Sequence, residues 1–322
     1  MKRVLKRLAA SLLLMLAVSV FTFLLAELAP GDYLAEMRLD PRISPETIAA
    51  LRARYGLDDP LPERYLGWLR SIASGELGYS FPRGMPVGPL LWPRARNTLL
   101  LTVLATALAW AIAVPLGVWA ASRPGGWLDR ASFGATALLM ATPDLLLGLG
   151  CLLLAVRTGL FPVGGMTSPG TGTETLWAEA LDVAWHLALP VAALVLASLP
   201  VLWRHVRSAM IEAMGAPFVR AARGHGVRRR RLLFRHALPA AANPLISLFG
   251  LSLAGLLSGS LLIEVIMSWP GLGPLLLEAI LARDLHLVIG SLLLSGLLLV
   301  AGNLAADLLL VWSDPRIRQE GT

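Results

Sequence analysis

Residues 97–121 read NTLLLTVLATALAWAIAVPLGVWAA and contain no charged side chain. A helix that crosses the hydrocarbon core of a bilayer needs about 20 largely apolar residues, and this run exceeds that length. Pro115 lies inside it, but proline is tolerated in a membrane helix where neighbouring groups satisfy the carbonyl that it frees. The sequence therefore predicts a membrane-spanning helix over residues 98–121.

The composition of the whole chain agrees with that prediction. Of its 322 residues, 56% are hydrophobic and only 15% are charged, whereas a globular domain carries about 25% charged and about 45–50% apolar residues. The single cysteine, Cys151, lies in another apolar run, and its being alone excludes an intramolecular disulfide framework and a cysteine-rich metal site. These properties indicate an all-α polytopic membrane protein.

Six stretches of the chain are long and apolar enough to span a membrane. The basic start MKRVLKR would suit a signal peptide, but the apolar run after it is too long for one and no clear A-x-A cleavage site follows. We therefore interpret the first stretch as a retained transmembrane helix and expect six transmembrane helices in all. The predicted spans are residues 8–29, 98–121, 132–156, 186–204, 238–265 and 287–311.

The distribution of Lys and Arg predicts which side of the membrane each loop faces, because basic residues gather in short cytoplasmic loops. With the N-terminus inside, the cytoplasmic pieces and Arg204 at their edge hold 17 of the 28 Lys and Arg residues. The largest outside loop, 30–97, has nine arginines against eight acidic residues. Both termini are therefore predicted to be cytoplasmic. The cytoplasmic pieces are residues 1–7, 122–131, 205–237 and 312–322.

The outside loop 30–97 is predicted to contain two helices. The first lies in SPETIAALRARYG, where Ser44 is a candidate N-cap ahead of a proline that suits the first helical position. The second is expected over residues 62–72, with Trp68 and other apolar side chains on related faces. We expect these faces to lie on the membrane surface or on the ends of the spans.

The largest cytoplasmic piece leads into FVRAARGHGVRRRRLLFRHALPAAANP, residues 218–244. Residues 207–223 favour a helix, the GHG at 224–226 breaks it, and a short basic helix is expected over 228–237. A helix–turn–helix that lies parallel to the membrane and is joined directly to two spans is suited to act as a lever.

Four arginines stand in a row at residues 228–231. In a soluble protein such a run would suggest nucleic-acid binding, but in this apolar chain the membrane is the better interpretation. We expect the run to reflect cytoplasmic topology and to contact anionic lipid headgroups, each charge contributing about 1 kcal/mol. Direct contact with a partner protein is the alternative.

The same segment resembles a cytoplasmic signature of bacterial ABC-transporter membrane subunits. That signature reads E-A-A, three residues, Gly, nine residues, and I-x-L-P. Arginine for Glu and histidine for Ile depart from it here, and both departures look like the dipeptide/oligopeptide/nickel branch of the family. The residues of this chain at the signature positions are Arg220, Ala221, Ala222, Gly226, His236, Leu238 and Pro239.

The resemblance extends over nearly the whole chain, in the same order and spacing. LAPGD follows the first span, LRARYGLDDPLPERYLGWL and GELGYSF lie in the outside loop, and WPGLGPLLLEAILARD and DPRIR lie toward the end. One departure is MATPD in the third span, because the family usually has an apolar or aromatic residue near Asp144.

The resemblance implies a permease subunit of an ATP-binding-cassette importer, with a single transmembrane permease domain over residues 1–322. Its core spans would occupy 98–311, after the helix 8–29 and the periplasmic loop 30–97. A coupling helix would lie between the fourth and fifth spans, and the seven signature residues would form the ATPase-coupling loop. Among them, the two alanines and the glycine are the better candidates for docking, since small residues permit close approach.

The resemblance also implies partners. In a bacterial inner membrane, the chain would pair with a homologous second permease and two cytosolic ATP-binding subunits, and a periplasmic or extracellular solute-binding protein would deliver the substrate. Closure of the ATPases would move the loop and reorient the spans, as alternating access requires. The substrate would be a peptide, a nickel chelate or another small solute; no cofactor and no nucleic acid is implied.

Two acidic residues within predicted spans are candidates for the translocation path. A carboxylate such as Asp144 costs about 2.5–3.5 kcal/mol at the middle of a span, so we expect it to avoid lipid and either to meet a cationic group of the substrate or to form an interhelical hydrogen bond. Glu264 precedes VIMSWPGLG, an outside loop that would reach into the binding protein or gate the path. The alternative for Glu264 is a helix cap or an interhelical bond. Asp307 is expected to anchor the inner end of the last span.

Two other functional classes stay open as alternatives. A stand-alone channel or secondary transporter would need its own ion site, marked by paired broken half-helices, and a membrane enzyme would need catalytic side chains clustered at one membrane face. The five histidines lack metal-ligand spacing, and no G-x-x-x-x-G-K-[ST] loop or nucleophile–base pair is present in the sequence. The sequence therefore predicts no metal site, no cofactor site, no catalytic residue and no ATPase site in this chain.

Overall fold

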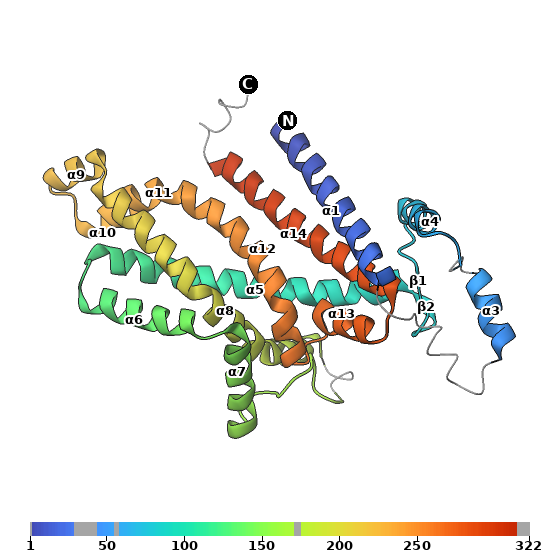
Figure 1. Cartoon of the computed structure of the whole chain (residues 1–322). Helices are drawn as coiled ribbons and strands as arrows, with labels where there is room; N and C mark the ends of the chain where they lie inside the picture. Colours follow the sequence, from blue (N-terminus) through green and yellow to red (C-terminus); the bar gives the residue numbers. More distant parts are fainter. Residues whose placement is uncertain (1, 29–43, 55–57, 171–174, 314–322) are drawn as a thin grey trace. The chain divides into compact units, whose positions relative to one another are not determined.

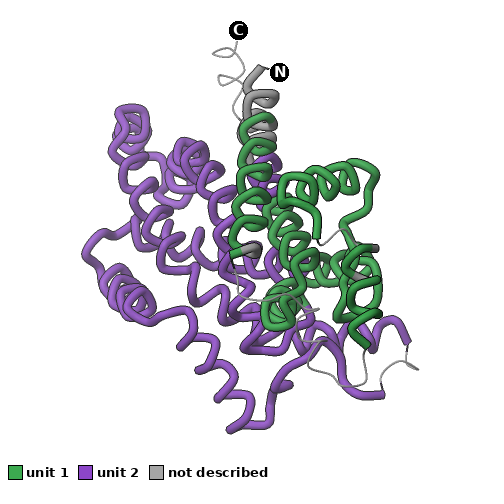
Figure 2. Tube along the Cα trace, turned by 45° about the vertical axis from the view of Figure 1, so that its right-hand side comes forward, with its two compact units in different colours: residues 1–97, 271–298 green, residues 98–270, 299–322 purple. Residues whose placement is uncertain are grey.

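The computed structural model describes residues 2–28, 44–54, 58–170 and 175–313, and within them the chain is mainly α-helical (Figure 1). It divides into two compact units (Figure 2). The first contains the residues up to Asn97 together with Gly271–Leu298, and the second contains Thr98–Pro270 together with the residues from Leu299 onward.

The first unit combines short helices with one small hairpin. Strands β1 and β2 pair antiparallel, with Tyr79 opposite Pro86 and Ser80 opposite Met85. The elements of this unit are α1 (Lys2–Leu28), α3 (Pro45–Arg54), α4 (Leu61–Ala73), β1 (Tyr79–Ser80), β2 (Met85–Pro86), the start of α5 (Val87–Ser122), α13 (Leu272–Leu281) and the first part of α14 (Leu285–Ser313).

The core of the first unit joins the outside loop to two long helices. Phe23 of α1, Trp68 of α4 and Ile289 of α14 are buried together, and the rings of Phe23 and Trp68 are 5.3 Å apart. The hydroxyls of Ser19 and Tyr65 are within hydrogen-bond distance at 2.9 Å. Of the two expected locations for this helix, the structure shows packing on other helices, α1 and the start of α14.

The hairpin and the helix α3 are held by side-chain hydrogen bonds. Ser80 donates a hydrogen bond to the carboxylate of Asp284, and the Arg83 guanidinium pairs with Glu278. The predicted N-cap is confirmed, because the Thr47 N–H donates to the Ser44 Oγ at 3.2 Å. These contacts tie the polar parts of the first unit to its own helices.

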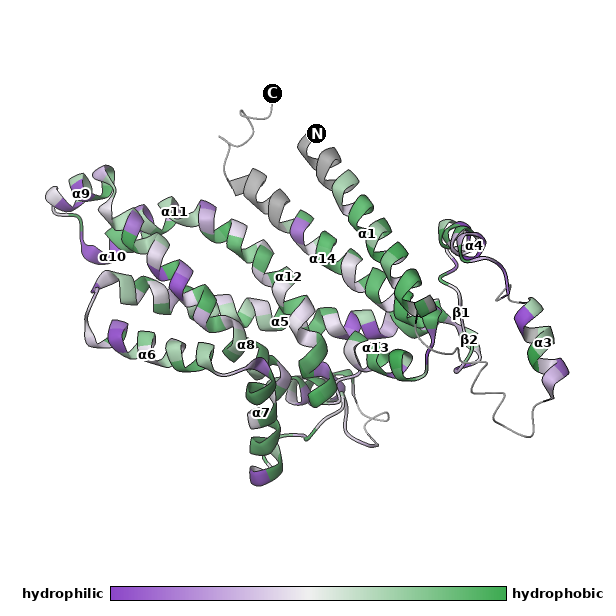
Figure 3. Ribbon diagram, in the orientation of Figure 1, coloured by the Kyte–Doolittle hydropathy of each residue, from purple (hydrophilic) through white to green (hydrophobic). Residues whose placement is uncertain are grey.

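The second unit is built around the 40-residue helix α8, which packs against α6, α7 and α12. In Figure 3 the helix α7 is coloured mainly hydrophobic, whereas hydrophilic residues gather at α10. The elements of this unit are the rest of α5, α6 (Trp127–Ala141), α7 (Asp144–Thr158), α8 (Leu176–Gly215), α9 (Pro217–Gly224), α10 (Arg229–Leu232), a π-helical turn (Leu233–Ala237), α11 (Leu238–Ala240), α12 (Ala242–Ile266) and the end of α14.

One face of α5 carries a small or apolar residue at every fourth position, so that these residues lie in line along the helix. Small side chains there allow other helices to approach closely. A Cβ added at Gly117 would lie only 2.6 Å from Val206 Cγ1 of α8. The other residues of this stripe, all buried, are Leu101, Ala105, Ala109, Ala113 and Ala121.

Within the part of the chain that the structure describes, four helices are long and apolar enough to cross a membrane, and they match predicted spans: Val87–Ser122, Leu176–Gly215, Ala242–Ile266 and Leu285–Ala305. The apolar part of α1, Ala9–Leu25, is shorter within the described residues. The side chain of Asp307, the LAPGD stretch beyond Leu28 and the terminal residues 314–322 lie outside the described residues.

The third predicted span, 132–156, differs from the prediction. It is two helices, α6 and α7, with a bend of 99° between them. Thr142 is extended at ψ 119° and Pro143 follows at ψ 144°, because a residue before proline is driven out of the helical region and proline itself has no N–H to continue the ladder. The pair forms either one broken span or a re-entrant segment.

Candidate functional site

The segment that follows α8 starts with a sharp break. Ala216 is extended, with ψ 144°, and the next residue is Pro217 in the first turn of α9. Proline suits that position because the first N–H groups of a helix have no partner within it. The predicted helix over residues 207–223 is therefore wrong as one piece: it consists of the end of α8 and a separate helix, α9.

Helix α9 has one packed side and one open side. Val219 is fully buried, whereas Phe218 is 53% exposed. Arg220 and Ala221 are exposed, and Ala222 is half-buried. Three of the predicted coupling residues are thus brought together on this short helix, and two of them lie on its open side.

Gly226 ends this helix with a left-handed turn. Its φ is +75°, and its N–H donates to the Arg223 carbonyl at 3.0 Å, while the Val227 N–H donates to the Ala222 carbonyl at 3.2 Å. Glycine is favoured here because a side chain destabilises positive φ. A Cβ added at Gly226 would meet nothing within 4 Å. The glycine of the signature therefore makes the turn and leaves the surface beside it clear.

The stretch of chain after Gly226 packs against the second unit through apolar side chains. The predicted basic helix over 228–237 is divided into α10 and the π-helical turn. Leu233 and Ala237 of that turn are buried with Met210 of α8 and Val118 of α5. The arginines of α10 are exposed, so the segment contacts the second unit through its apolar side chains and leaves its charged groups accessible to solvent.

The last three signature residues lie at the end of this segment. His236 is in the π-helical turn and is half-buried, as is Leu238, while Pro239 is exposed in the three-residue helix α11. Proline has no N–H for the helical ladder, and π-helical turns are frequent at functional sites. The joint between the segment and α12 is therefore irregular backbone, as a hinge would require.

An ion pair that the sequence analysis did not predict joins α6 to α8 near the end of α8 that leads into α9. The Arg207 guanidinium of α8 donates two hydrogen bonds to Asp129 of α6, with Nη2 2.8 Å from Oδ2, and the Gly125 N–H donates to the same carboxylate at 2.8 Å. Asp129 is 5% exposed. The sequence did contain a hint of this pair, because Asp129 is the single acidic residue in the predicted cytoplasmic piece 122–131.

The two candidate path residues occupy different environments. Asp144 is the first residue of α7, directly after the bend, and it is exposed. Glu264 of α12 is fully buried, and Ser260 Oγ donates to its Oε1 at 3.4 Å. Within the described residues, no group of three His, Cys, Asp or Glu side chains is placed to hold a metal ion. The open face of α9 is thus the best-formed candidate site, and it is suited to contact rather than to chemistry.

Comparison with known families agrees with this arrangement. Residues 113–319 match the family described as "Binding-protein-dependent transport system inner membrane component". Residues 1–102 match a second family described as the N-terminal part of a binding-protein-dependent transport system membrane component. The two matches together extend over nearly all of the chain.

Relatives of known function are similar over their full length. The oligopeptide transport system permease protein AppB of Bacillus subtilis (strain 168) is 36% identical over 318 residues, which cover 98% of each chain. The dipeptide transport system permease protein DppB of Escherichia coli (strain K12) is 34% identical over 334 residues and likewise covers 98% of each chain.

Solved structures of the MetNI methionine ABC transporter in inward-facing conformations share the fold. One matches with a TM-score of 0.52 at 19% identity, covering 70% of this chain and 96% of that chain. Another matches with a TM-score of 0.55 at 19% identity, covering 70% and 99%. From its sequence families and its full-length relatives, the chain belongs to the binding-protein-dependent transport system inner membrane components, and it is a permease subunit of an ATP-binding-cassette importer.

Proposed function

We propose that this permease imports peptides or a related small solute, forms half of the translocation path with a homologous second permease, and is driven by two cytosolic ATP-binding subunits. The observation that carries the proposal is the open face of α9, which ends in the clear left-handed turn at Gly226. It coincides with the signature positions at which the family couples to its ATPases.

The proposed topology has six transmembrane helices and both termini in the cytoplasm. In this topology α6 and α7 together make one broken span. The 17 Lys and Arg residues in the predicted cytoplasmic pieces and at their edge support this orientation. The α9 segment then faces the cytosol, where ATP-binding subunits are found.

Coupling would proceed through the two helices that flank the segment. The segment is continuous with α8 at one end and leads through the π-helical turn to α12 at the other, and α8 packs directly against α12. An ATPase that binds α9 would therefore move α8 and α12 together. Binding of ATP would set which rigid-body arrangement is populated.

The peptide substrate is supported by the relatives, whose names are oligopeptide and dipeptide permease. A solute-binding protein would deliver the peptide, since the family works with one by description. Asp144 is exposed at the bend between α6 and α7 and would meet a positively charged group such as a peptide amine. Glu264 is buried and would act within the helix bundle.

The experiment is reconstitution in liposomes with the proteins encoded by the neighbouring genes. We expect ATP-dependent uptake of short peptides that requires the binding protein and both ATP-binding subunits. The control is the same assembly with the phosphate-loop lysine of the ATP-binding subunits replaced by alanine, which should abolish uptake. Uptake by this chain in liposomes that lack any ATP-binding subunit would contradict the proposal and favour a stand-alone channel or secondary transporter.

A further inference from the structure

A cavity of about 510 Å³ lies in the second unit between the ends of α5 and α8 and the α9–α10 segment. Volumes of about 300–1,000 Å³ are usual for sites that hold a small ligand. Part of its wall is apolar, with Ile211 and Met214 from α8 and Leu232 from α10. The cavity is therefore large enough for a small molecule or for part of a lipid.

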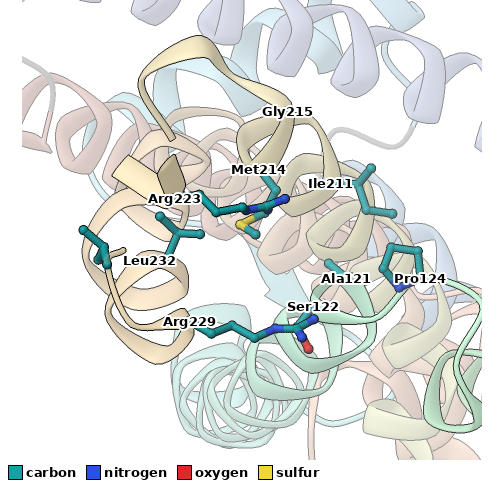
Figure 4. Close-up of a pocket in the computed structure, with 10 residues that line it drawn as sticks. Ala121, Ser122, Pro124, Ile211, Met214, Gly215, Arg223, Arg229 and Leu232 are labelled. Atoms are coloured by element: carbon teal, nitrogen blue, oxygen red, sulfur yellow. The ribbon is translucent and has the colours of Figure 1, made fainter. Parts of the chain in front are cut away.

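Two arginines give this cavity its charge. Arg223 comes from α9 and Arg229 from α10. Figure 4 shows both side chains extending from that segment toward the facing helix ends, which carry Met214 and Ser122. The residues that line the cavity include no aspartate or glutamate, and the ion pairs described in this structure involve neither arginine. Two guanidinium groups thus face one hollow without an acidic partner there.

The cavity lies at the end of a helix that is apolar enough to cross a membrane. Ala121, Ser122 and Pro124 contribute to its wall, and the uncharged run in α5 ends at Ala121. The end of such a run marks the level at which hydrocarbon gives way to headgroups and water. In the predicted topology the two arginines would therefore reach the cavity near the level of the lipid phosphate groups.

We propose that this cavity binds a phosphate-bearing anionic group, of the kind that the headgroup of an anionic phospholipid presents. An arginine fork matches phosphate oxygens with paired, charge-assisted hydrogen bonds, and basic pockets between membrane helices bind anionic headgroups. The apolar wall suits the glycerol and the first carbons of the acyl chains. Free phosphate has the same chemistry and is the other source to distinguish.

This site differs from a general attraction of the basic run 228–231 to the membrane. Of those four arginines only Arg229 lines the cavity, and its partner, Arg223, lies outside the run. All of these arginines are exposed, but Arg230 and Arg231 are not part of the wall. Arg230 and Arg231 therefore serve as a control for lipid binding that depends on surface charge alone.

The experiment uses the whole transporter complex in nanodiscs of phosphatidylcholine that contain increasing fractions of a photo-crosslinkable phosphatidylglycerol. Crosslinking to the peptides that contain residues 211–215 and 223–232 is measured against the phosphatidylglycerol fraction. The double variant Arg223→Ala/Arg229→Ala should raise the half-saturating fraction roughly tenfold or more, since both guanidinium groups that would bond the phosphate oxygens are lost. The double variant Arg230→Ala/Arg231→Ala, with the same loss of charge, should change it less than roughly threefold.

A second pair of variants tests the cavity without removing charge. Gly215 lines the cavity and Gly224 does not, and an added Cβ meets nothing within 4 Å at either position. Gly215→Leu should fill the hollow and lower crosslinking, while Gly224→Leu should leave it unchanged. This pair gives an answer even if the arginine variants assemble poorly.

The outcomes separate the proposal from its rivals. Equal losses in the two arginine double variants would overturn the site in favour of a diffuse surface field, and no loss in either would overturn it outright. Competition by millimolar inorganic phosphate would support the phosphate site and identify free phosphate as a sufficient source. Resistance to that competition, with the expected variant pattern, would support a lipid headgroup. None of these measurements depends on which solute the transporter imports.

Discussion

Gly117 and Gly226 lie in opposite environments within the second unit. A Cβ at Gly117 would lie 2.6 Å from Val206 Cγ1 and 3.2 Å from the Arg207 backbone nitrogen, whereas a Cβ at Gly226 would meet nothing within 4 Å. The first glycine lets α5 and α8 touch, while the second makes a turn at a φ of +75° and leaves open space. One glycine completes a contact inside this chain, and the other leaves room for a contact with another chain.

The helices around these glycines differ in the same way. Buried residues occur along α8 from His186 to Ala213, whereas Val219 is the one fully buried residue of α9. The surface of α8 is thus largely occupied by its own chain, and that of α9 is not. Substitutions in the packed region should therefore act on folding, and substitutions on the open segment should act on coupling.

The largest effect is expected for Gly117→Leu. The new side chain overlaps Val206 and the backbone of α8, and overpacking of a tight contact costs about 3 kcal/mol at the upper end of its usual range. We expect a lower thermal midpoint and a reduced yield of the folded chain in detergent. Gly134→Leu in α6 is the matched control, since an added Cβ there meets nothing within 4 Å. Equal losses of stability in both variants would contradict a close α5–α8 contact at Gly117.

The next effect is expected for Arg207→Met, which removes the partner of a buried carboxylate. Asp129 keeps the Gly125 N–H but loses two charge-assisted hydrogen bonds, and we expect a loss of about 2 kcal/mol in the free energy of unfolding. The double variant Arg207→Met/Asp129→Asn should recover part of this loss, because no buried charge is left unpaired. A double variant as unstable as the sum of the two single variants would contradict the pairing.

On the open side, Gly226→Trp should leave folding and membrane insertion intact and lower ATP-driven uptake by roughly tenfold, equivalent to about 1.4 kcal/mol of docking. Gly226→Ala is its control, since it carries the same cost of a side chain at positive φ without the bulk. We expect a loss of uptake of less than roughly threefold for Ala, because the strain of about 1–2 kcal/mol acts on folding of the turn rather than on docking. The measurement is peptide uptake together with ATP hydrolysis in the reconstituted complex. Similar losses in both variants would assign the effect to backbone strain, and normal uptake with Trp would remove the docking role.

The positions of the long helices could be predicted because apolar length is a local property of the sequence. The helices α5, α8, α12 and α14 match four of the six predicted spans, with shifts at their ends. The break before Pro217 and the bend at Pro143 could not be assigned in advance, since proline either ends a helix or is tolerated in it according to what the neighbouring helices satisfy. A proline therefore makes such a break possible without determining from sequence that it occurs.

Of the candidate site, only the residues of the signature motif could be predicted from the sequence. The resemblance to a family signature pointed to Gly226 and the alanines of α9, because a signature is read from the order and spacing of residues along the chain. The pairing of Asp129 with Arg207 joins residues that are 78 positions apart, and the choice of Arg229 rather than its neighbours to line a cavity depends on the orientation of a four-residue helix. Neither follows from residue type or spacing.

The smallest effect is expected for the two acidic residues that the sequence analysis treated as one pair of path candidates, Asp144 and Glu264, and it should differ between them. Asp144 is exposed at a helix bend, and Glu264 is buried with a hydroxyl partner. Asp144→Asn should therefore leave the thermal midpoint unchanged and lower uptake of peptides with a free amine by a few-fold, roughly what one exposed ion pair contributes, while N-acetylated peptides are unaffected. Glu264→Gln should instead lower the midpoint, because it alters a buried hydrogen bond. Unchanged uptake of every peptide by Asp144→Asn would remove this residue from the path, and its carboxylate would then serve only the first turn of α7, where a negative charge is favourable.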